Sequence, residues 1–139
     1  MNEMFVKTSA DAAAIIRAEL PKVQKEERVF VLPLDANGKM LAKPILVSVG
    51  HQDGTTAIDA GAIFREALAA RAEEIIVAHN HPSGDPTPSK ADIAATEKLR
   101  EAGDLLGVPI LDHIILDNSN LSQHDGFLSM AETIGLCNP

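Results

Sequence analysis

The sequence predicts a single α/β domain in which a mixed β-sheet is flanked by helices. The chain has 139 residues, of which 45% are hydrophobic, so one domain with a substantial core is expected without disulfide or metal staples. Segments with helix signals alternate with short apolar runs, in the order α-β-β-α-β-α-β-(β)-α. That order implies a mixed sheet with helices packed on it. We find no repeat and no interdomain linker, so residues 1–139 are expected to form one domain.

Local signals assign each element in turn. Helices are predicted at residues 8–22, 59–72, 89–107 and 127–136, and strands at 28–35, 39–50, 74–79, 108–116 and 119–123. Thr8 and Asp11 form a capping box at the start of the first helix, and Pro21 ends it. Asn37-Gly38 is a strong hairpin signal between the first two strands. Pro44 indicates an edge strand or a bulge in the second.

Apolar spacing predicts which helix positions face the core. These positions are Ile63, Ala67 and Leu68 in the second helix and Ile93, Leu99 and Leu105 in the third. Asp59 is a plausible cap for the second helix, and Gly103 or Gly107 marks the end of the third. The runs at 74–79 and 108–116 are short and rich in β-branched residues, so both are predicted to be buried inner strands.

The charge balance argues against a dedicated nucleic-acid or membrane binder. The net charge is −8, and the 12 basic residues are scattered along the chain, whereas phosphates require clustered Lys and Arg. Lys22, Lys25 and Arg28 are the nearest approach to a basic patch. The absence of Trp and Tyr removes most of the platforms on which single-stranded bases stack. We therefore expect no nucleic-acid partner for the isolated chain and no membrane partner.

Cysteine usage and the first residues suggest a compartment. Cys137 is the single cysteine, which excludes a disulfide framework and fits a reducing environment. The start of the chain has no basic region followed by an apolar stretch. No apolar run approaches membrane-spanning length. We expect a cytoplasmic protein.

The stretch AHNHPSGDPTPSKAD, residues 78–92, is the strongest candidate site. Side chains two apart on a strand point to the same side, so His79 and His81 can direct both imidazoles at one point. Catalytic zinc needs a third ligand and an open position for water, and Asp92 can supply the carboxylate. Three prolines in the intervening loop lower the entropy cost of holding a fixed geometry.

The same residues have a purely structural interpretation. Ser89 and Asp92 have capping-box spacing, so both can serve only to start the third helix. Histidine pairs near turns also occur without a metal. On spacing alone the two interpretations remain open, because short motifs carry a risk of false positives.

The pattern H-x-H-P, followed after six residues by S-x-x-D, resembles the motif of the JAMM (JAB1/MPN/Mov34) metalloenzymes. The longer string from residue 78 to 116 is similar to the RadC-like branch of that superfamily, and the resemblance covers residues 27–122. It implies a JAB/MPN, cytidine deaminase-like architecture. It also implies a zinc-dependent hydrolase that cleaves an amide or isopeptide bond of a peptide or protein, with His79, His81 and Asp92 as the zinc ligands.

The resemblance also assigns roles outside the ligand set. Glu27 lies eight residues before Asp35 and matches the family's upstream acid, which would shuttle protons to and from the attacking water; the adjacent Glu26 is the residue most easily confused with it. Ser89 matches the serine placed near the substrate oxyanion. His113, at the end of a strand, is expected to be a hydrogen-bonded structural residue, with contact to the site as the alternative.

Two departures from the RadC-like pattern bear on the substrate. Gly61 stands where an arginine is usual, and SQHDGF at residues 122–127 lacks the arginine of the family's later motif. Both remove positive charge that would bind a carboxylate or phosphate. The chain is also expected to lack the N-terminal helix-hairpin-helix region of full-length RadC-like proteins. The alternatives to a hydrolase are a non-catalytic or DNA-repair-associated protein and a metal-dependent nuclease.

Overall fold

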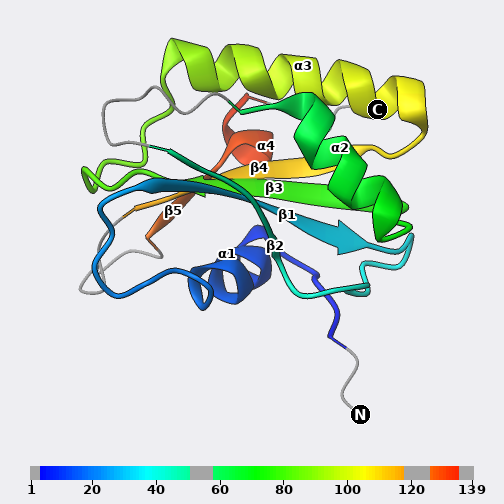
Figure 1. Cartoon of the computed structure of the whole chain (residues 1–139), viewed down its shortest axis with the longest axis horizontal. Helices are drawn as coiled ribbons and strands as arrows, with labels where there is room; N and C mark the ends of the chain where they lie inside the picture. The colour runs from blue at the N-terminus through cyan, green and yellow to red at the C-terminus, as the bar shows by residue number, and fades with distance from the viewer. Residues whose placement is uncertain (1–3, 51–57, 118–125, 135–139) are drawn as a thin grey trace.

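A five-stranded mixed sheet forms the centre of the molecule (Figure 1). The computed structural model describes residues 4–50, 58–117 and 126–134. The sheet has the order β2-β1-β3-β4-β5, with strands β1 Glu27–Leu34, β2 Ile45–Gly50, β3 Glu74–Asn80, β4 Ile110–Leu116 and β5 Phe127–Ser129. The pair β3–β4 is parallel, and the other neighbours are antiparallel. The predicted α/β class and the inner positions of β3 and β4 are confirmed.

Helices cover both faces of the sheet. The helices are α1 Ser9–Arg17, α2 Ala60–Ala69, α3 Lys90–Leu106 and α4 Met130–Ile134. Figure 1 shows α1 on one face, with α2 and α3 together on the other. The order of helices and strands along the chain is the predicted one. Among the described residues, no helix has both the length and the apolar character needed to cross a membrane.

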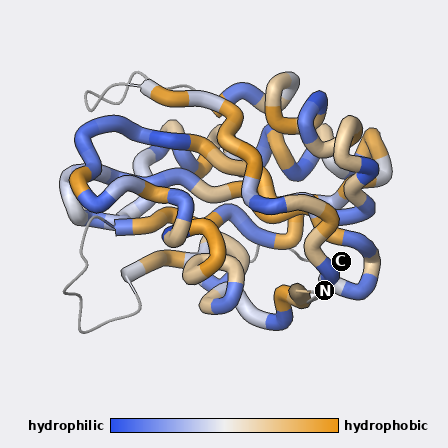
Figure 2. The backbone as a smooth tube through the Cα atoms, turned by 60° about the horizontal axis from the view of Figure 1, so that its bottom comes forward, coloured by the Kyte–Doolittle hydropathy of each residue, from blue (hydrophilic) through white to orange (hydrophobic). Residues whose placement is uncertain are grey.

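The two faces of the sheet bury separate apolar clusters. Alternate residues of a strand point to opposite faces. Figure 2 shows hydrophobic and hydrophilic stretches following one another along the backbone. Val29, Val31 and Val77 pack toward α2 and α3, whereas Phe30, Leu32 and Ala78 pack toward α1. Odd-numbered positions of β1 and β3 therefore face α2 and α3. This parity decides where the polar residues at the ends of these strands point.

Local signals at the element ends act as expected. Thr8 caps α1 and Asp59 caps α2 through their side chains. Gly107 ends α3 in the left-handed conformation, with φ +73°, which costs glycine little. The hairpin turn closes with a hydrogen bond of 3.1 Å from the Gly38 N–H to the Asp35 carbonyl.

Three predicted core positions are wrong. Leu68 is 49% exposed, Ile93 37% and Leu105 88%. In α3 the buried positions are Thr96, Leu99 and Gly103, which recur at intervals of three and four and form one helical stripe. The prediction considered large apolar residues alone. Because the buried stripe contains a threonine and a glycine, the prediction assigned it to the wrong positions. Gly103 is required there because a Cβ would lie 2.6 Å from the Val108 carbonyl oxygen.

The ends of three other elements also differ from prediction. The first helix ends at Arg17, before Pro21. The predicted helix at 127–136 begins as strand β5, which pairs with β4, and helix α4 starts only at Met130. Pairing with an available sheet edge overrides the helical pattern there. The predicted strand at 119–123 lies outside the described residues. The strand predicted at 39–50 begins only at Ile45, so Pro44 precedes β2 and does not interrupt it. The edge position expected for β2 is confirmed, and its register with β1 shifts between Val29 and Phe30.

Candidate metal centre

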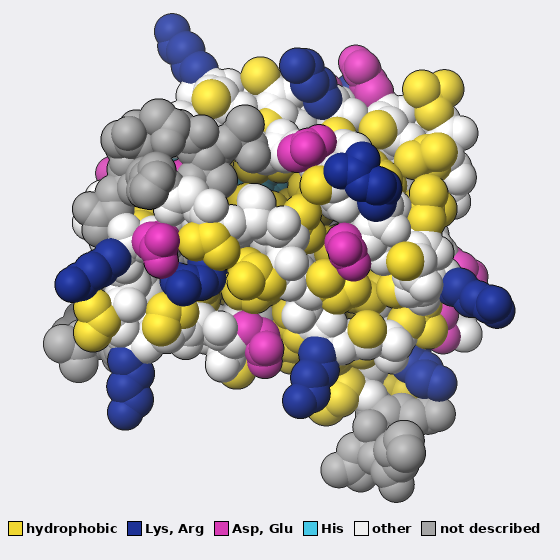
Figure 3. Space-filling model, viewed as in Figure 1, with side chains coloured by type: hydrophobic (Ala, Val, Ile, Leu, Met, Phe, Trp, Pro, Cys, Tyr) yellow, Lys and Arg dark blue, Asp and Glu magenta, His cyan; other side chains and the backbone are white. Residues whose placement is uncertain are grey.

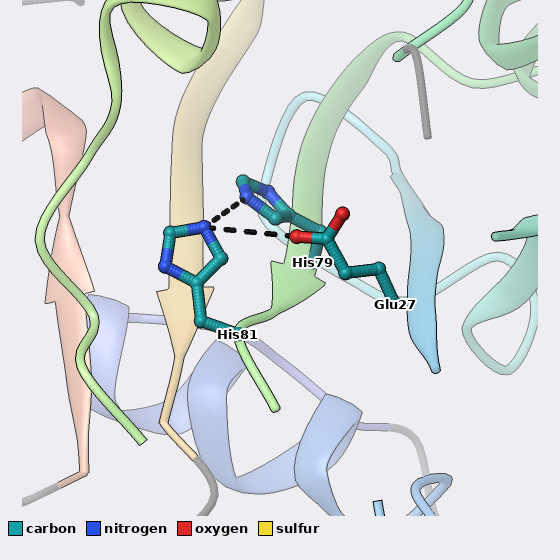
Figure 4. Close-up of side chains that lie close together, drawn as sticks. All are labelled: Glu27, His79 and His81. Carbon is teal, nitrogen blue, oxygen red and sulfur yellow. Dashed lines mark hydrogen bonds and ion pairs between the residues drawn. The ribbon is translucent and has the colours of Figure 1, made fainter. Parts of the chain in front are cut away.

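The two histidines of the H-x-H pattern converge at the carboxyl end of β3. His79 pairs with Val29 of β1 and shares its orientation toward the α2–α3 face. His81 follows two residues later, and its backbone N–H donates to the Leu116 carbonyl at 2.8 Å, which holds it beside β4. The two Nε2 atoms lie 3.0 Å apart. Figure 4 shows the rings turned toward each other, as the two-residue spacing predicts.

Asp92 completes the cluster from the first turn of α3. Its Oδ1 lies 3.3 Å from His79 Nε2, and its Oδ2 lies 3.2 Å from His81 Nε2. Ser89 holds this turn in place: its Oγ accepts from the Asp92 N–H at 3.0 Å, and its own N–H donates to Asp92 Oδ2 at 2.9 Å. The predicted capping box is therefore present, and its carboxylate also faces both histidines.

Glu27 reaches the same point from the neighbouring strand. It is the first residue of β1, and its odd position directs it to the face that carries His79. Its Oε1 lies 3.9 Å from His81 Nε2 (Figure 4). Ligand atoms of Glu27, His79 and His81 all lie within 4.8 Å of one another. The side chains of Glu27 and His81 are each 14% exposed, whereas that of His79 is 3% exposed, so the cluster is partly buried.

The electrostatics of the cluster favour a positive charge at its centre. Burial alone would raise the pKa of Asp92, but hydrogen bonds to His79 and His81 outweigh it and hold that pKa well below its usual range. The hydrogen bond to Asp92 raises the pKa of His81 despite partial burial. Carboxylate oxygens only accept hydrogen bonds, so both directions mean that a proton or a metal ion between these groups is stabilised.

The three groups lie close enough together to surround one metal ion. Tetrahedral ligands at bond lengths of about 2.0–2.1 Å lie about 3.3–3.4 Å from one another. The two histidine Nε2 atoms, 3.0 Å apart, are slightly closer than that, and Asp92 contacts them through different oxygens, Oδ1 at 3.3 Å from His79 and Oδ2 at 3.2 Å from His81. The 3.9 Å from Glu27 Oε1 to His81 Nε2 is longer than these separations. His81 is oriented for this role because its Nδ1 lies 2.8 Å from the Asp85 carbonyl, which can only accept, so Nε2 is left for the cluster.

Ser89 occupies the helix start, as both interpretations of its motif require. It is exposed, and its Oγ uses an acceptor lone pair in the cap. The hydroxyl hydrogen is not consumed by that bond, so the same group can still donate to a bound molecule. The cap is observed, whereas a role toward an oxyanion stays a prediction.

Two residues, His113 and Asn80, support the cluster, although the sequence gives only a weak indication of either role. His113 of β4 is fully buried; its Nε2 lies 2.8 Å from His79 Nδ1, and its Nδ1 lies 2.6 Å from Thr96 Oγ1. Burial, followed by the nearby charge of His79, lowers the pKa of His113 well below its usual value. The alternative expectation for His113, contact with the site, is thus the observed one. The parallel pairing of Val77 with His113 brings the ring there.

Asn80, between the two histidines, supports the strand that carries Glu27. Its even position directs it to the opposite face of the sheet. Its Oδ1 accepts from the Arg28 N–H at 2.7 Å, and its Nδ2 donates to the Glu26 carbonyl at 3.1 Å. These two bonds flank Glu27 on either side along the backbone. An Asn in this position therefore fixes where β1 begins relative to the histidines.

Comparison with known families agrees with the geometry. The model of the RadC-like JAB domain matches residues 6–135. The chain belongs to the RadC-like JAB domain family. The predicted family and its JAB/MPN-type α/β architecture are confirmed, and the JAB superfamily includes hydrolases. The residues that form the cluster lie within the matched range.

Several relatives share the name UPF0758. The chain is 35% identical to UPF0758 protein CPE2144 of Clostridium perfringens, over 88% of this chain and 53% of that protein. It is 40% identical to UPF0758 protein tlr1707 of Thermosynechococcus vestitus, over 85% of this chain and 46% of that protein. A UPF0758 protein of Carboxydothermus hydrogenoformans is 45% identical, over 67% of this chain and 40% of its own length. The chain thus spans about half the length of the curated relatives that it matches.

Proposed function

We propose that this RadC-like JAB domain is a zinc-dependent hydrolase that cleaves an amide or isopeptide bond in a peptide or protein. The observation that carries the proposal is the convergence of His79, His81 and Asp92, with pairwise separations of 3.0–3.3 Å. These three side chains would hold the ion and leave a position open toward Glu27. A zinc ion there would polarise the scissile carbonyl and make a water molecule a better nucleophile at neutral pH.

Glu27 would act as the general base and acid. Its carboxylate lies beyond ligand spacing from His81, at 3.9 Å, which suits a group that contacts the attacking water rather than the metal. A base must lie within hydrogen-bond reach of the proton that it takes. Glu27 would accept that proton and return it to the leaving nitrogen.

Ser89 would stabilise the negative charge that develops on the carbonyl oxygen. Its hydroxyl hydrogen is free of the cap, and it adjoins Asp92 at the start of a 17-residue helix. Helix starts favour negative charge because their backbone N–H groups point outward. The Ser89 side chain would therefore both cap α3 and donate a hydrogen bond to the negatively charged oxygen.

A substitution pair tests the role of Glu27. Glu27→Gln preserves shape and hydrogen bonding while removing the base, so zinc should stay bound while turnover falls on the order of a hundredfold to ten-thousandfold. Glu26→Gln is the matched control, because the exposed side chain of Glu26 forms a 3.6 Å ion pair with Arg28. Turnover would be measured on the zinc-loaded protein with libraries of fluorogenic peptides and of lysine-linked isopeptides.

The outcomes separate the possible roles. Loss of zinc in Glu27→Gln would make Glu27 a ligand. Equal turnover of Glu27→Gln and the unsubstituted protein would remove it from the chemistry. A zinc-loaded protein that cleaves no member of either library would contradict the proposed hydrolase and favour a non-catalytic RadC-like protein.

The charge distribution gives no specific support to a nuclease. On the face seen in Figure 3, Lys and Arg side chains stand apart from one another. Arg28, one of the three residues of the sparse basic segment with Lys22 and Lys25, is paired with Glu26. Cleavage of a phosphodiester needs cationic contacts to hold the polyanion. We therefore propose a peptide or protein substrate rather than DNA or RNA.

A further inference from the structure

A chain of hydrogen bonds runs behind His79 and returns to the start of α3. His79 Nδ1 contacts His113 Nε2 at 2.8 Å, and His113 Nδ1 contacts Thr96 Oγ1 at 2.6 Å. Thr96 Oγ1 donates to the backbone carbonyl of Asp92 at 2.8 Å. The Asp92 carboxylate in turn faces His79 Nε2 at 3.3 Å. These four residues form a closed ring that joins β3, β4 and α3.

The single hydrogen of the Thr96 hydroxyl determines where the other hydrogens of this ring lie. A threonine hydroxyl has one hydrogen, and Thr96 gives it to a backbone carbonyl, which can only accept. Thr96 Oγ1 must then accept from His113, so His113 carries its proton on Nδ1. A neutral imidazole has one N–H and one lone pair. His113 Nε2 therefore accepts, and the donor is Nδ1 of His79.

We propose that His113 and Thr96 are positioning residues that keep the proton of His79 on Nδ1. With one proton held on Nδ1, Nε2 is the ring atom of His79 that can exchange its proton for a metal ion, and it is the atom that faces Asp92 and His81. This inference rests on the proposed function only in the use it gives to Nε2, which would bind the zinc ion. The proton order itself is a property of the metal-free protein.

Because the ring is buried, its hydrogen bonds fix the positions of the protons. His113 and Thr96 are both fully buried, and His79 is 3% exposed. Water therefore does not compete for these hydrogen bonds, and an unpaired group inside the ring would cost free energy. Reversing the order would require the Thr96 hydroxyl to leave the Asp92 carbonyl. It would also place an N–H on His79 Nε2, where it would occupy the lone pair needed by a metal.

Thr96→Val and Thr96→Ser form the decisive pair of variants. Valine keeps the shape but removes the hydroxyl, so a proton on His113 Nδ1 would be a buried N–H without a partner, which proteins rarely tolerate. We expect the His113 proton to move to Nε2 in Thr96→Val and the His79 proton to move to its own Nε2. Serine keeps the hydroxyl and should keep the original order.

Long-range ¹H–¹⁵N correlation spectra of the metal-free protein would read the order directly, because the two ring nitrogens of a neutral histidine have distinct shifts. They should be recorded in alkaline buffer, where imidazoles are neutral. The expected result is protonated Nδ1 on His79 in the unsubstituted protein and in Thr96→Ser, and protonated Nε2 in Thr96→Val. Zinc affinity should fall about 10–100-fold in Thr96→Val alone, the usual cost of losing an outer partner of a ligand histidine.

Two results would overturn the inference: an Nδ1 of His79 that carries no proton in the unsubstituted protein, or a Thr96→Val protein with unchanged tautomer and unchanged zinc affinity. The spectra need neither zinc nor activity, which separates this inference from the proposed function. A protein that binds no zinc but reverses its tautomer in Thr96→Val would contradict the metal site and uphold the proton order.

Discussion

Helices α1 and α3 begin with the same capping motif, yet only one of the two contacts the histidine cluster. Thr8 Oγ1 accepts from the Asp11 N–H at 3.0 Å, and Ser89 Oγ accepts from the Asp92 N–H at 3.0 Å. In both boxes the N–H of the cap residue donates to the aspartate carboxylate, at 3.2 Å in α1 and 2.9 Å in α3. As helix caps, the two motifs are equivalent.

The surroundings of the two carboxylates make the difference. Asp11 Oδ2 also accepts from the backbone N–H of Lys7 at 3.0 Å, on the α1 face of the sheet. Asp92 contacts His79 and His81 from the other face. A capping box is thus a local device, and it becomes part of a candidate site only where a neighbouring strand end supplies further ligands.

The largest expected effect separates the two aspartates. Asp92→Asn should weaken zinc binding by more than about a hundredfold, because loss of a direct ligand should exceed the 10–100-fold cost of losing an outer partner. Asp11→Asn alters an equivalent cap without touching the histidines and should leave zinc affinity unchanged. Competition titrations with a zinc chelator would measure both. Equal affinities in the two variants would remove Asp92 from the ligand set.

The two cap hydroxyls should differ in catalysis. Ser89→Ala should lower turnover about a hundredfold, the lower end of what one lost oxyanion donor costs, with zinc still bound. Thr8→Ala should leave turnover unchanged. The comparison would be made on zinc-loaded proteins with the best substrate from the peptide and isopeptide libraries. Unchanged turnover in Ser89→Ala would restrict Ser89 to its role as a cap.

Proton competition should make zinc affinity depend on pH. The pKa of His81 is raised by its hydrogen bond to Asp92, so Nε2 holds a proton at higher pH than an ordinary histidine. Zinc must displace that proton. Affinity should therefore fall about tenfold per pH unit once the pH drops below the raised pKa, and the fall should begin above the ordinary value of about 6.5. A flat profile down to pH 6 would contradict this.

The smallest expected effect is on the free energy of unfolding, for which the two capping boxes should behave alike. In the metal-free protein, Thr8→Ala and Ser89→Ala should each lower the free energy of unfolding by about 1 kcal/mol, the typical value of an N-cap side chain. Denaturant unfolding would measure both. A much larger loss for Ser89→Ala without zinc would mean that the second box stabilises the fold by more than capping.

The same comparison explains what the sequence could reveal. Both capping boxes, the order of elements and the convergence of His79 with His81 follow from local spacing, and all were predictable. That Asp92 faces the histidines depends on how the loop at 82–88 returns α3 to β3, which spacing alone left open. Leu105 was misplaced because the stripe that packs on the sheet runs through a threonine and a glycine.

His113 and Thr96 illustrate the limit more sharply. They are 17 residues apart and both are distant from His79 in sequence. His113 lies beside His79 because β3 and β4 pair in parallel with Val77 opposite His113. Strand register over a helical crossover is not encoded in any short motif, so the ring of hydrogen bonds behind His79 could not be read from the sequence.

X-ray absorption spectroscopy at the zinc edge is the most direct test of the central claim that the α3 cap carboxylate and the β3 histidines form one metal site. The zinc-loaded protein should show one ion per chain with two imidazole ligands and oxygen ligands at about 2.0–2.2 Å. Asp11→Asn and Glu27→Gln should give the same spectrum, and Asp92→Asn a changed one. An ion with fewer than two imidazoles, or a spectrum of Asp92→Asn identical to that of the unsubstituted protein, would contradict the account.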